Sequence, residues 1–144
     1  MIYTEMTMKA MKMAYEAHLG QVDYCNIPYI YHPIHLAEQM DDELSCTVAL
    51  LHDVVEDTAL TLDDIAAAFP AAVVEAVRYM THEDGVEYYD YVRAIRENPI
   101  AKKVKLADIE HNSDMTRCVG SDLSEERIEN WKKKYAKAKE VLLS

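Results

Sequence analysis

The sequence predicts an all-α fold, and three observations support this. The chain has only three glycines and four prolines in 144 residues, so turns are few. Apolar residues recur at helical spacing, for example at Tyr88, Tyr91 and Ile95. No segment alternates apolar and polar residues over the length of a strand. Half of the residues are hydrophobic, which is enough for one core, so we expect a single compact domain over residues 1–144.

Glycine, proline and capping residues divide the first part of the chain into helices. Gly20 ends the first helix, and Pro33 opens the second, which would place His32 just before a helix start. Thr61 begins a capping-box pattern ahead of an apolar run. The third helix is apolar nearly all round through Leu51, so it should be the central and most buried one. The expected helices are 4–18, 33–40, 45–57, 65–69 and 71–80.

Three more helices are expected in the rest of the chain. The first covers residues 88–97, the second starts at Pro99 and carries Asp108 inside an apolar run, and the last is capped by Ser121 or Ser124. An apolar stripe on the last helix should face the core, at Ile128, Trp131, Tyr135, Ala138 and Leu142. A second face should be exposed to solvent, with Lys132, Lys133, Lys134, Lys137 and Lys139.

Charge and composition exclude several classes of partner. A net charge of −11 argues against general binding of nucleic acid, which needs a basic surface. No apolar run approaches ~20 residues, so we expect no membrane span. The N-terminus lacks the apolar core of a signal peptide, and Cys25, Cys46 and Cys118 are widely spaced without a CxxC motif. These features argue against a disulfide framework and predict a cytoplasmic protein in a reducing compartment.

Ionisable residues in apolar segments indicate a metal site. His52 and Asp53 follow four apolar residues, Glu56 and Asp57 stand one helical turn later, and Asp108 interrupts another apolar helix. Taken one by one, such residues are more often caps or simple ion pairs. Buried charges are costly unless paired or bound to a metal, and one arrangement satisfies all of them together. In it, a divalent metal is held by His32, His52, Asp53 and Asp108.

Such a centre would support hydrolysis. Two imidazoles and two carboxylates suit Mn²⁺, Fe²⁺, Co²⁺, Ni²⁺ or Zn²⁺ without selecting among them. A metal ion lowers the pKa of the water it binds and supplies hydroxide near neutral pH. Glu56 and Asp57 would face the open coordination positions, where either could orient the nucleophile or carry a proton.

Four motifs resemble one known family. They are His18-Leu19-Gly20-Gln21, the segment from Pro28 to Pro33 with the pattern PYxxHP, the segment from Leu50 to Thr58 with the pattern LLHDVxED, and the segment from Lys105 to Asn112 with the pattern KLADxxHN. In order and spacing, over roughly residues 5–117, the chain is similar to the HD-domain phosphohydrolases, and most similar to the hydrolase domain of RelA/SpoT-type proteins and the small stand-alone alarmone hydrolases.

The resemblance implies a single HD-type domain that removes the 3′-pyrophosphate of guanosine tetra- and pentaphosphate, (p)ppGpp. It implies that the four residues above bind the metal, usually manganese, and that Glu56 and Asp57 assist the attacking water. Asn112 matches a nucleotide-contacting asparagine, and Tyr24 and Lys105 complete the substrate-binding residues that we expect.

The chain departs from the family pattern at positions that are usually basic. Asp23 and Tyr24 replace a basic pair, and Ile109 and Asp114 replace two more basic positions. A polyphosphorylated substrate would therefore meet a more acidic pocket. Two alternatives stay open: hydrolysis of another small phosphoester, such as a nucleoside monophosphate or cyclic nucleotide, and a non-catalytic metal- or nucleotide-binding module. A homo-oligomer is also possible.

Overall fold

The structure, a computed structural model, describes all residues from Met1 to Ser144 and contains no strand. A single isolated bridge pairs Val22 with Pro28. The all-α prediction is confirmed. The helices, in chain order, are α1 (Glu5–Ala17), α2 (Tyr31–Glu38), α3 (Glu43–Leu51), α4 (Val54–Asp57), α5 (Leu62–Ala66), α6 (Ala71–Met80), α7 (Tyr88–Ile95), α8 (Pro99–Ser113), the 3₁₀-helix η1 (Met115–Cys118) and α9 (Glu125–Leu143).

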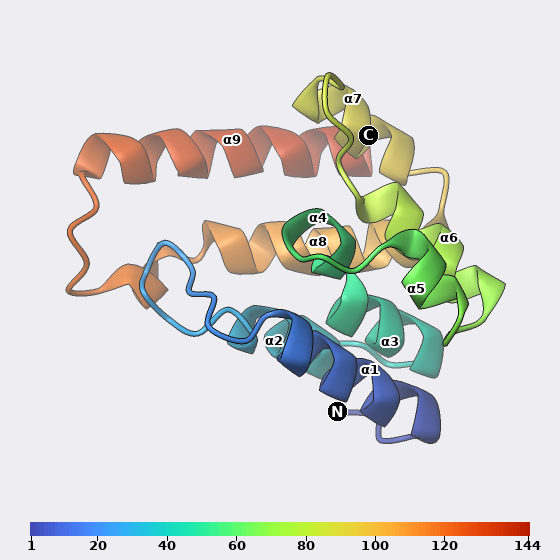
Figure 1. The fold of residues 1–144 in the computed structure, drawn as a ribbon. Helices are drawn as coiled ribbons and strands as arrows, with labels where there is room; N and C mark the ends of the chain where they lie inside the picture. Colours follow the sequence, from blue (N-terminus) through green and yellow to red (C-terminus); the bar gives the residue numbers. More distant parts are fainter.

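Helix α3 is the centre of the molecule. It packs against α1, α2, α6 and α8, while α9 lies along the far side of α8 (Figure 1). Every residue from Ser45 to Leu51 is buried, because the helix itself is apolar nearly all round. The prediction of a central, most buried helix is confirmed. None of the helices is both long and apolar enough to span a lipid bilayer.

Most helix starts follow from capping residues. Thr61 and Asp64 form the expected capping box, and α5 begins directly after it, at Leu62, earlier than expected. Ser124, not Ser121, caps α9 by accepting the backbone N–H of Arg127. Side-chain caps satisfy N–H groups that have no partner inside the helix, so they fix where the capped helices begin.

Two further helix boundaries, both beside the predicted site residues, differ from expectation. Helix α2 starts at Tyr31, so His32 lies inside its first turn and not before it. Proline is tolerated there because the first N–H groups of a helix have no partner in any case. The expected helix 45–57 is also broken: α3 ends at Leu51, and a turn at His52 and Asp53 leads into the short α4.

The structure corrects the expectation of unpaired cysteines. Cys25, in the loop between α1 and α2, is joined to Cys118 of η1 by a disulfide, with the two Cα atoms 4.7 Å apart. The two cysteines are separated by 93 residues, so their spacing in the sequence gives no sign of the pair. Cys46 is free and buried.

Candidate active site

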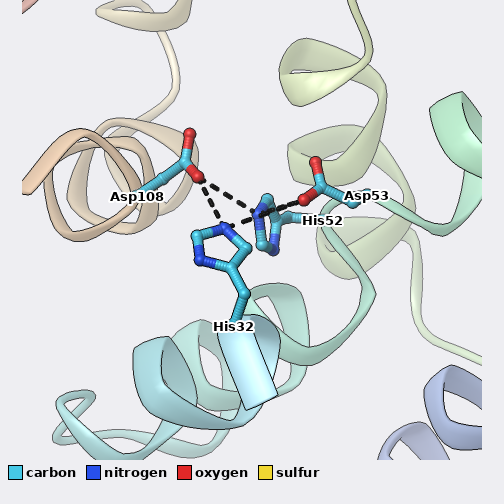
Figure 2. A group of neighbouring side chains, drawn as sticks. All are labelled: His32, His52, Asp53 and Asp108. Atoms are coloured by element: carbon cyan, nitrogen blue, oxygen red, sulfur yellow. Dashed lines mark hydrogen bonds and ion pairs between the residues drawn. The ribbon is translucent and has the colours of Figure 1, made fainter. Parts of the chain in front are cut away.

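Four predicted side chains meet between α2, α8 and the turn that joins α3 to α4 (Figure 2). His32, His52, Asp53 and Asp108 each offer one ligand atom, and these atoms all lie within 4.8 Å of one another. Asp108 Oδ1 lies 2.9 Å from His32 Nε2, and Asp53 Oδ2 lies 2.9 Å from His52 Nε2. Asp53 is half-buried and the other three are buried.

The break after α3 sets the orientation of His52. Its Nδ1 donates to the carbonyl oxygen of Ala49, at 2.7 Å, a position that the N–H of Asp53 would take in a continuous helix. This fixes the proton of a neutral ring on Nδ1 and leaves a lone pair on Nε2. That Nε2 is buried, faces the carboxylates and makes no hydrogen bond of favourable geometry. A lone pair directed at two carboxylates is unfavourable unless a cation lies between them.

The electrostatics of the cluster also call for positive charge. Burial opposes protonation of His52, but the negative charges of Asp53 and Asp108 outweigh burial and hold the pKa of His52 well above its ordinary value. Burial raises the pKa of Asp53, but the adjacent His52 charge overcomes this and lowers it to about 2. The donor atoms therefore fit a divalent metal ion, which would supply the charge that the carboxylates attract.

Further side chains orient the four residues. His111 Nδ1 lies 2.7 Å from His32 Nδ1, and burial, followed by the neighbouring His32, lowers the pKa of His111 to about 4. A neutral His111 can therefore accept the Nδ1 proton of His32, which leaves His32 Nε2 free to bind a cation. The hydroxyl of Tyr29 donates to Asp53 Oδ2.

Sequence reasoning did not identify Tyr29 and His111 as site residues, although both lie in quoted motifs. The available signal was their spacing. Tyr29 stands three residues before His32, and His111 stands three residues after Asp108. On a helix or at its entrance, this spacing places two side chains on one face.

The cluster opens onto a cavity of about 770 Å³. Every predicted site residue lines this cavity: His32, His52, Asp53, Asp108, Glu56, Asp57, Asn112, Tyr24 and Lys105. The Nζ of Lys105 donates to Asp108 Oδ2 at 2.8 Å, and the amide of Asn112 donates to Asp108 Oδ1 at 3.1 Å. Tyr24 is exposed at the cavity wall, with its ring 4.7 Å from that of Trp131.

Glu56 and Asp57 lie on α4 beside Asp53, and the carboxylates of all three approach within 4.8 Å of one another. Glu56 Oε1 accepts the backbone N–H of His82 at 2.7 Å. Burial and the negative charges of Asp53 and Glu56 raise the pKa of Asp57 to about 6. A cation at the centre would lower it again, since it offsets those charges.

The glutamine of the first motif secures the α4 segment. Gln21 Nε2 donates to the backbone carbonyl of Asp57 at 2.9 Å, and His18 Nδ1 lies 2.8 Å from Gln21 Oε1. His18 is buried, so the chain of contacts anchors α4 to the end of α1. The first motif therefore lies beside the proposed metal site although it contributes no proposed metal ligand.

The positions that lack the family's basic residues have distinct surroundings. Asp23 forms an ion pair with Arg117 at 2.9 Å. Ile109 is buried in the core, and Asp114 caps η1 outside the cavity lining. The expected acidic pocket is therefore balanced in part by Arg117 and by Lys134 of α9, both of which line it.

Helix α9 contributes more to the cavity than its sequence pattern indicated. Trp131 and Tyr135 were expected in the core, but both are half-buried and line the cavity. Lys134 is exposed, as expected, and it also lines the cavity. The periodicity of an amphipathic helix distinguishes inward from outward faces, but it cannot separate a core from a cavity wall.

The chain is similar in sequence and in structure to several known proteins. No model of a protein family matches the sequence. The chain is 37% identical over 116 residues to the guanosine-3′,5′-bis(diphosphate) 3′-pyrophosphohydrolase MESH1 of Mus musculus, and the match covers 72% of this chain. It spans 65% of the length of that relative and of the one from Homo sapiens.

Two further matches are more extensive. MESH1 of Danio rerio is 32% identical over 142 residues, with 89% of this chain and 79% of the relative covered. A solved structure of a metazoan orthologue of SpoT, described as hydrolysing ppGpp, matches with a TM-score of 0.78 and 27% identity, over 99% of this chain and 88% of that one. The chain therefore belongs to the family of MESH1- and SpoT-type guanosine-3′,5′-bis(diphosphate) 3′-pyrophosphohydrolases.

Proposed function

We propose that this chain removes the 3′-pyrophosphate of (p)ppGpp-like nucleotides, with Mn²⁺ as the cofactor. One observation carries the proposal: four metal-type donors converge on a single point of a cavity that is also lined by two further carboxylates. The relatives that share the fold are named for this reaction, which supports the choice of substrate. The balance of charge in the cavity allows it, since Lys105, Arg117 and Lys134 line it together with the acidic residues.

We assign the metal to His32, His52, Asp53 and Asp108 on the chemistry of the donor set. A divalent ion bound there would supply Lewis acidity and lower the pKa of water, so that hydroxide is available to attack phosphorus near neutral pH. Glu56 and Asp57 take up the proton of the attacking water and orient it, because their carboxylates lie beside Asp53 on the cavity side of α4.

The reaction balances as a hydrolysis. The oxygen of water bonds to the phosphorus next to the ribose, and the bond from that phosphorus to the 3′ oxygen breaks. The proton held by Glu56 or Asp57 passes to the departing 3′ oxygen, so the products are pyrophosphate and a nucleotide with a free 3′ hydroxyl. Asn112, Tyr24 and Lys105 contact the substrate in this proposal, since all three line the cavity.

The ion pair of Asp23 with Arg117 favours a second candidate. It neutralises one cation of the cavity, which suits a substrate with fewer charges, such as a nucleoside monophosphate or a cyclic nucleotide.

The single HD-type domain over 1–144 is supported by one continuous core of 25 buried residues. The cytoplasmic location, the absence of a nucleic-acid partner and a homo-oligomeric state stay predictions from the sequence.

Release of pyrophosphate from guanosine tetraphosphate by the Mn²⁺-loaded protein tests the proposal. Asp53→Ala should abolish release, because it removes one of the proposed ligands. Asp63→Ala is the matched control, since Asp63 is an exposed acid on α5 away from the cavity. A folded, loaded wild type that hydrolyses only monophosphates or cyclic nucleotides would overturn the substrate. A protein that binds no metal in titration would favour the non-catalytic alternative.

A further inference from the structure

One cation of the cavity lining has no acidic partner. Lys105, Arg117 and Lys134 are the lysine and arginine residues of that lining. Lys105 forms an ion pair with Asp108 at 2.8 Å, and Arg117 forms one with Asp23 at 2.9 Å. Lys134 forms neither an ion pair nor a hydrogen bond with any residue of the chain. Its charge is therefore available to a ligand in the cavity.

The ammonium of Lys134 is connected to the candidate metal centre through one aromatic ring and Lys105. Its Nζ is 4.3 Å from the centre of the Tyr88 ring, and the Nζ of Lys105 is 5.9 Å from the centre of the same ring. Lys105 in turn contacts Asp108, a proposed metal ligand. A single aromatic side chain therefore links Lys134 to the edge of the metal centre, and cation–π contacts with Tyr88 and Tyr135 position its ammonium.

Two like charges beside one ring repel each other. Desolvation, followed by the positive charge of Lys105, lowers the pKa of Lys134. An anion that lies between the metal centre and Lys134 would relieve both effects, since it restores a favourable environment for the ammonium. A protein with a net charge of −11 needs such a local cation if it is to retain a polyanion.

We infer that Lys134 binds a phosphate oxygen of the substrate's diphosphate group and makes the site select diphosphates over monophosphates. This inference rests on the proposed function and deepens it. One phosphate of the pair would lie at the metal centre, and the other would reach Lys134 beside Tyr88. Lysine binds phosphate as a point charge, so no fixed hydrogen-bonding geometry is required.

The neighbouring Lys133 provides a matched control. It lies one residue away on α9 and, like Lys134, is exposed and has no ionic partner, but it does not line the cavity. Lys133→Gln removes the same charge from the same helix, so it reports any general effect of charge on substrate attraction. Lys134→Gln has the same general effect and also removes a charge from the cavity, so the difference between the two variants measures the contribution of the cavity charge.

The test measures binding and turnover separately. Pyrophosphate and orthophosphate are titrated into Mn²⁺-loaded protein by calorimetry, with equal Mn²⁺ in both solutions so that its own complexes cancel. Lys134→Gln should weaken pyrophosphate binding by about tenfold to a hundredfold, the range of a hydrogen bond to a charged group, and orthophosphate binding by less than about twofold. Lys134→Arg should recover most of the affinity, and Lys133→Gln should match the wild type.

Kinetics with guanosine tetraphosphate give the second readout. Lys134→Gln should raise KM by a similar factor and change kcat by less than about threefold, because a binding contact is lost while the metal centre stays intact. Equal pyrophosphate affinity in Lys134→Gln and wild type would overturn the inference. A wild type that binds no pyrophosphate would overturn it too, and so would a fall in kcat with unchanged KM.

The two proposals fail separately. If the wild type does not hydrolyse guanosine tetraphosphate but binds pyrophosphate more tightly than Lys134→Gln does, the proposed substrate is wrong and the role of Lys134 stands. If the wild type hydrolyses it and Lys134→Gln behaves identically, the proposed function stands and the role of Lys134 is wrong.

Discussion

A single hydrogen bond at His52 organises the candidate metal centre. By donating Nδ1 to the carbonyl of Ala49, the imidazole ends α3 and directs its other nitrogen toward Asp53 and Asp108. The same contact fixes the tautomer that a metal ligand needs. One side chain therefore determines a helix end, a ring orientation and the position of a lone pair.

His111 should tune the affinity for metal without touching it. His111→Ala removes the acceptor that orients His32, and we expect a loss of about tenfold to a hundredfold in Mn²⁺ affinity, the usual effect of losing such a partner. His111→Asn should retain more, since its amide oxygen can accept a hydrogen bond near the position of Nδ1. Titration with Mn²⁺ measures the effect.

His35→Ala is the control for this prediction. His35 is exposed and stacks on His111, with ring centres 4.1 Å apart, but its side chain forms no hydrogen bond or ion pair with the proposed ligands. It should bind Mn²⁺ as the wild type does. Equal affinity in His111→Ala and the wild type would show that His32 is held in place by the helix alone.

At this scale the sequence is informative wherever a motif fixes both residue type and spacing. The nine predicted residues lie on one cavity because their motifs are local and specific. Lys134 escaped prediction for a physical reason: in the sequence it is one lysine in a run of three, and only the packing of α9 on α8 distinguishes it.

At the scale of elements, side-chain contacts with the backbone explain most of the differences from expectation. Hydrophobic periodicity predicted a continuous helix over 45–57, because residues on both sides of the break are apolar. Hydrophobic periodicity carries no information about the hydrogen bond from the His52 ring to the Ala49 carbonyl, which ends α3. The start of α8 at Pro99 was predicted correctly, since its capping residue, Asn98, acts within a few residues of itself.

The loop before α2 is tied to η1 by two contacts, the disulfide from Cys25 to Cys118 and the ion pair from Asp23 to Arg117. All four residues line the cavity, so these contacts build part of its wall. Because the partners are far apart in sequence, neither contact can be predicted from local pattern. Together they position Tyr24 against Trp131.

Peptide mapping of the oxidised protein should find this disulfide. Digestion without reductant should yield a linked pair of peptides that contain Cys25 and Cys118, because their Cα atoms lie within bridging distance. Cys46 should react with an alkylating reagent only after unfolding, since it is buried. Rapid alkylation of Cys25 and Cys118 in the folded, oxidised protein would contradict this arrangement.

At the scale of the whole molecule, the site joins segments that are far apart in the chain. The proposed ligands come from α2, α8 and the turn after α3, so they meet only when these elements pack around the central helix (Figure 1). The all-α class followed from composition and periodicity. How the helices pack did not, because it depends on which apolar faces fit one another.

Metal binding should therefore stabilise the fold. A ligand that binds only the folded state at a hundredfold excess over its Kd adds about 2.7 kcal/mol, which raises Tm by on the order of 10 °C in a domain of this size. We expect Mn²⁺ to raise Tm in a thermal melt and a chelator to reverse the effect. Asp108→Asn should lose the shift, and an undiminished shift in that variant would place the binding elsewhere.

The central claim is that His32, His52, Asp53 and Asp108 hold one divalent metal ion at the cavity. Anomalous diffraction at the manganese absorption edge, from crystals grown with Mn²⁺, tests this claim most directly. We predict one strong peak within about 2.0–2.3 Å of His32 Nε2, His52 Nε2 and one oxygen of each aspartate. A map with no peak between these four side chains, or with its strongest peak elsewhere, would contradict the account.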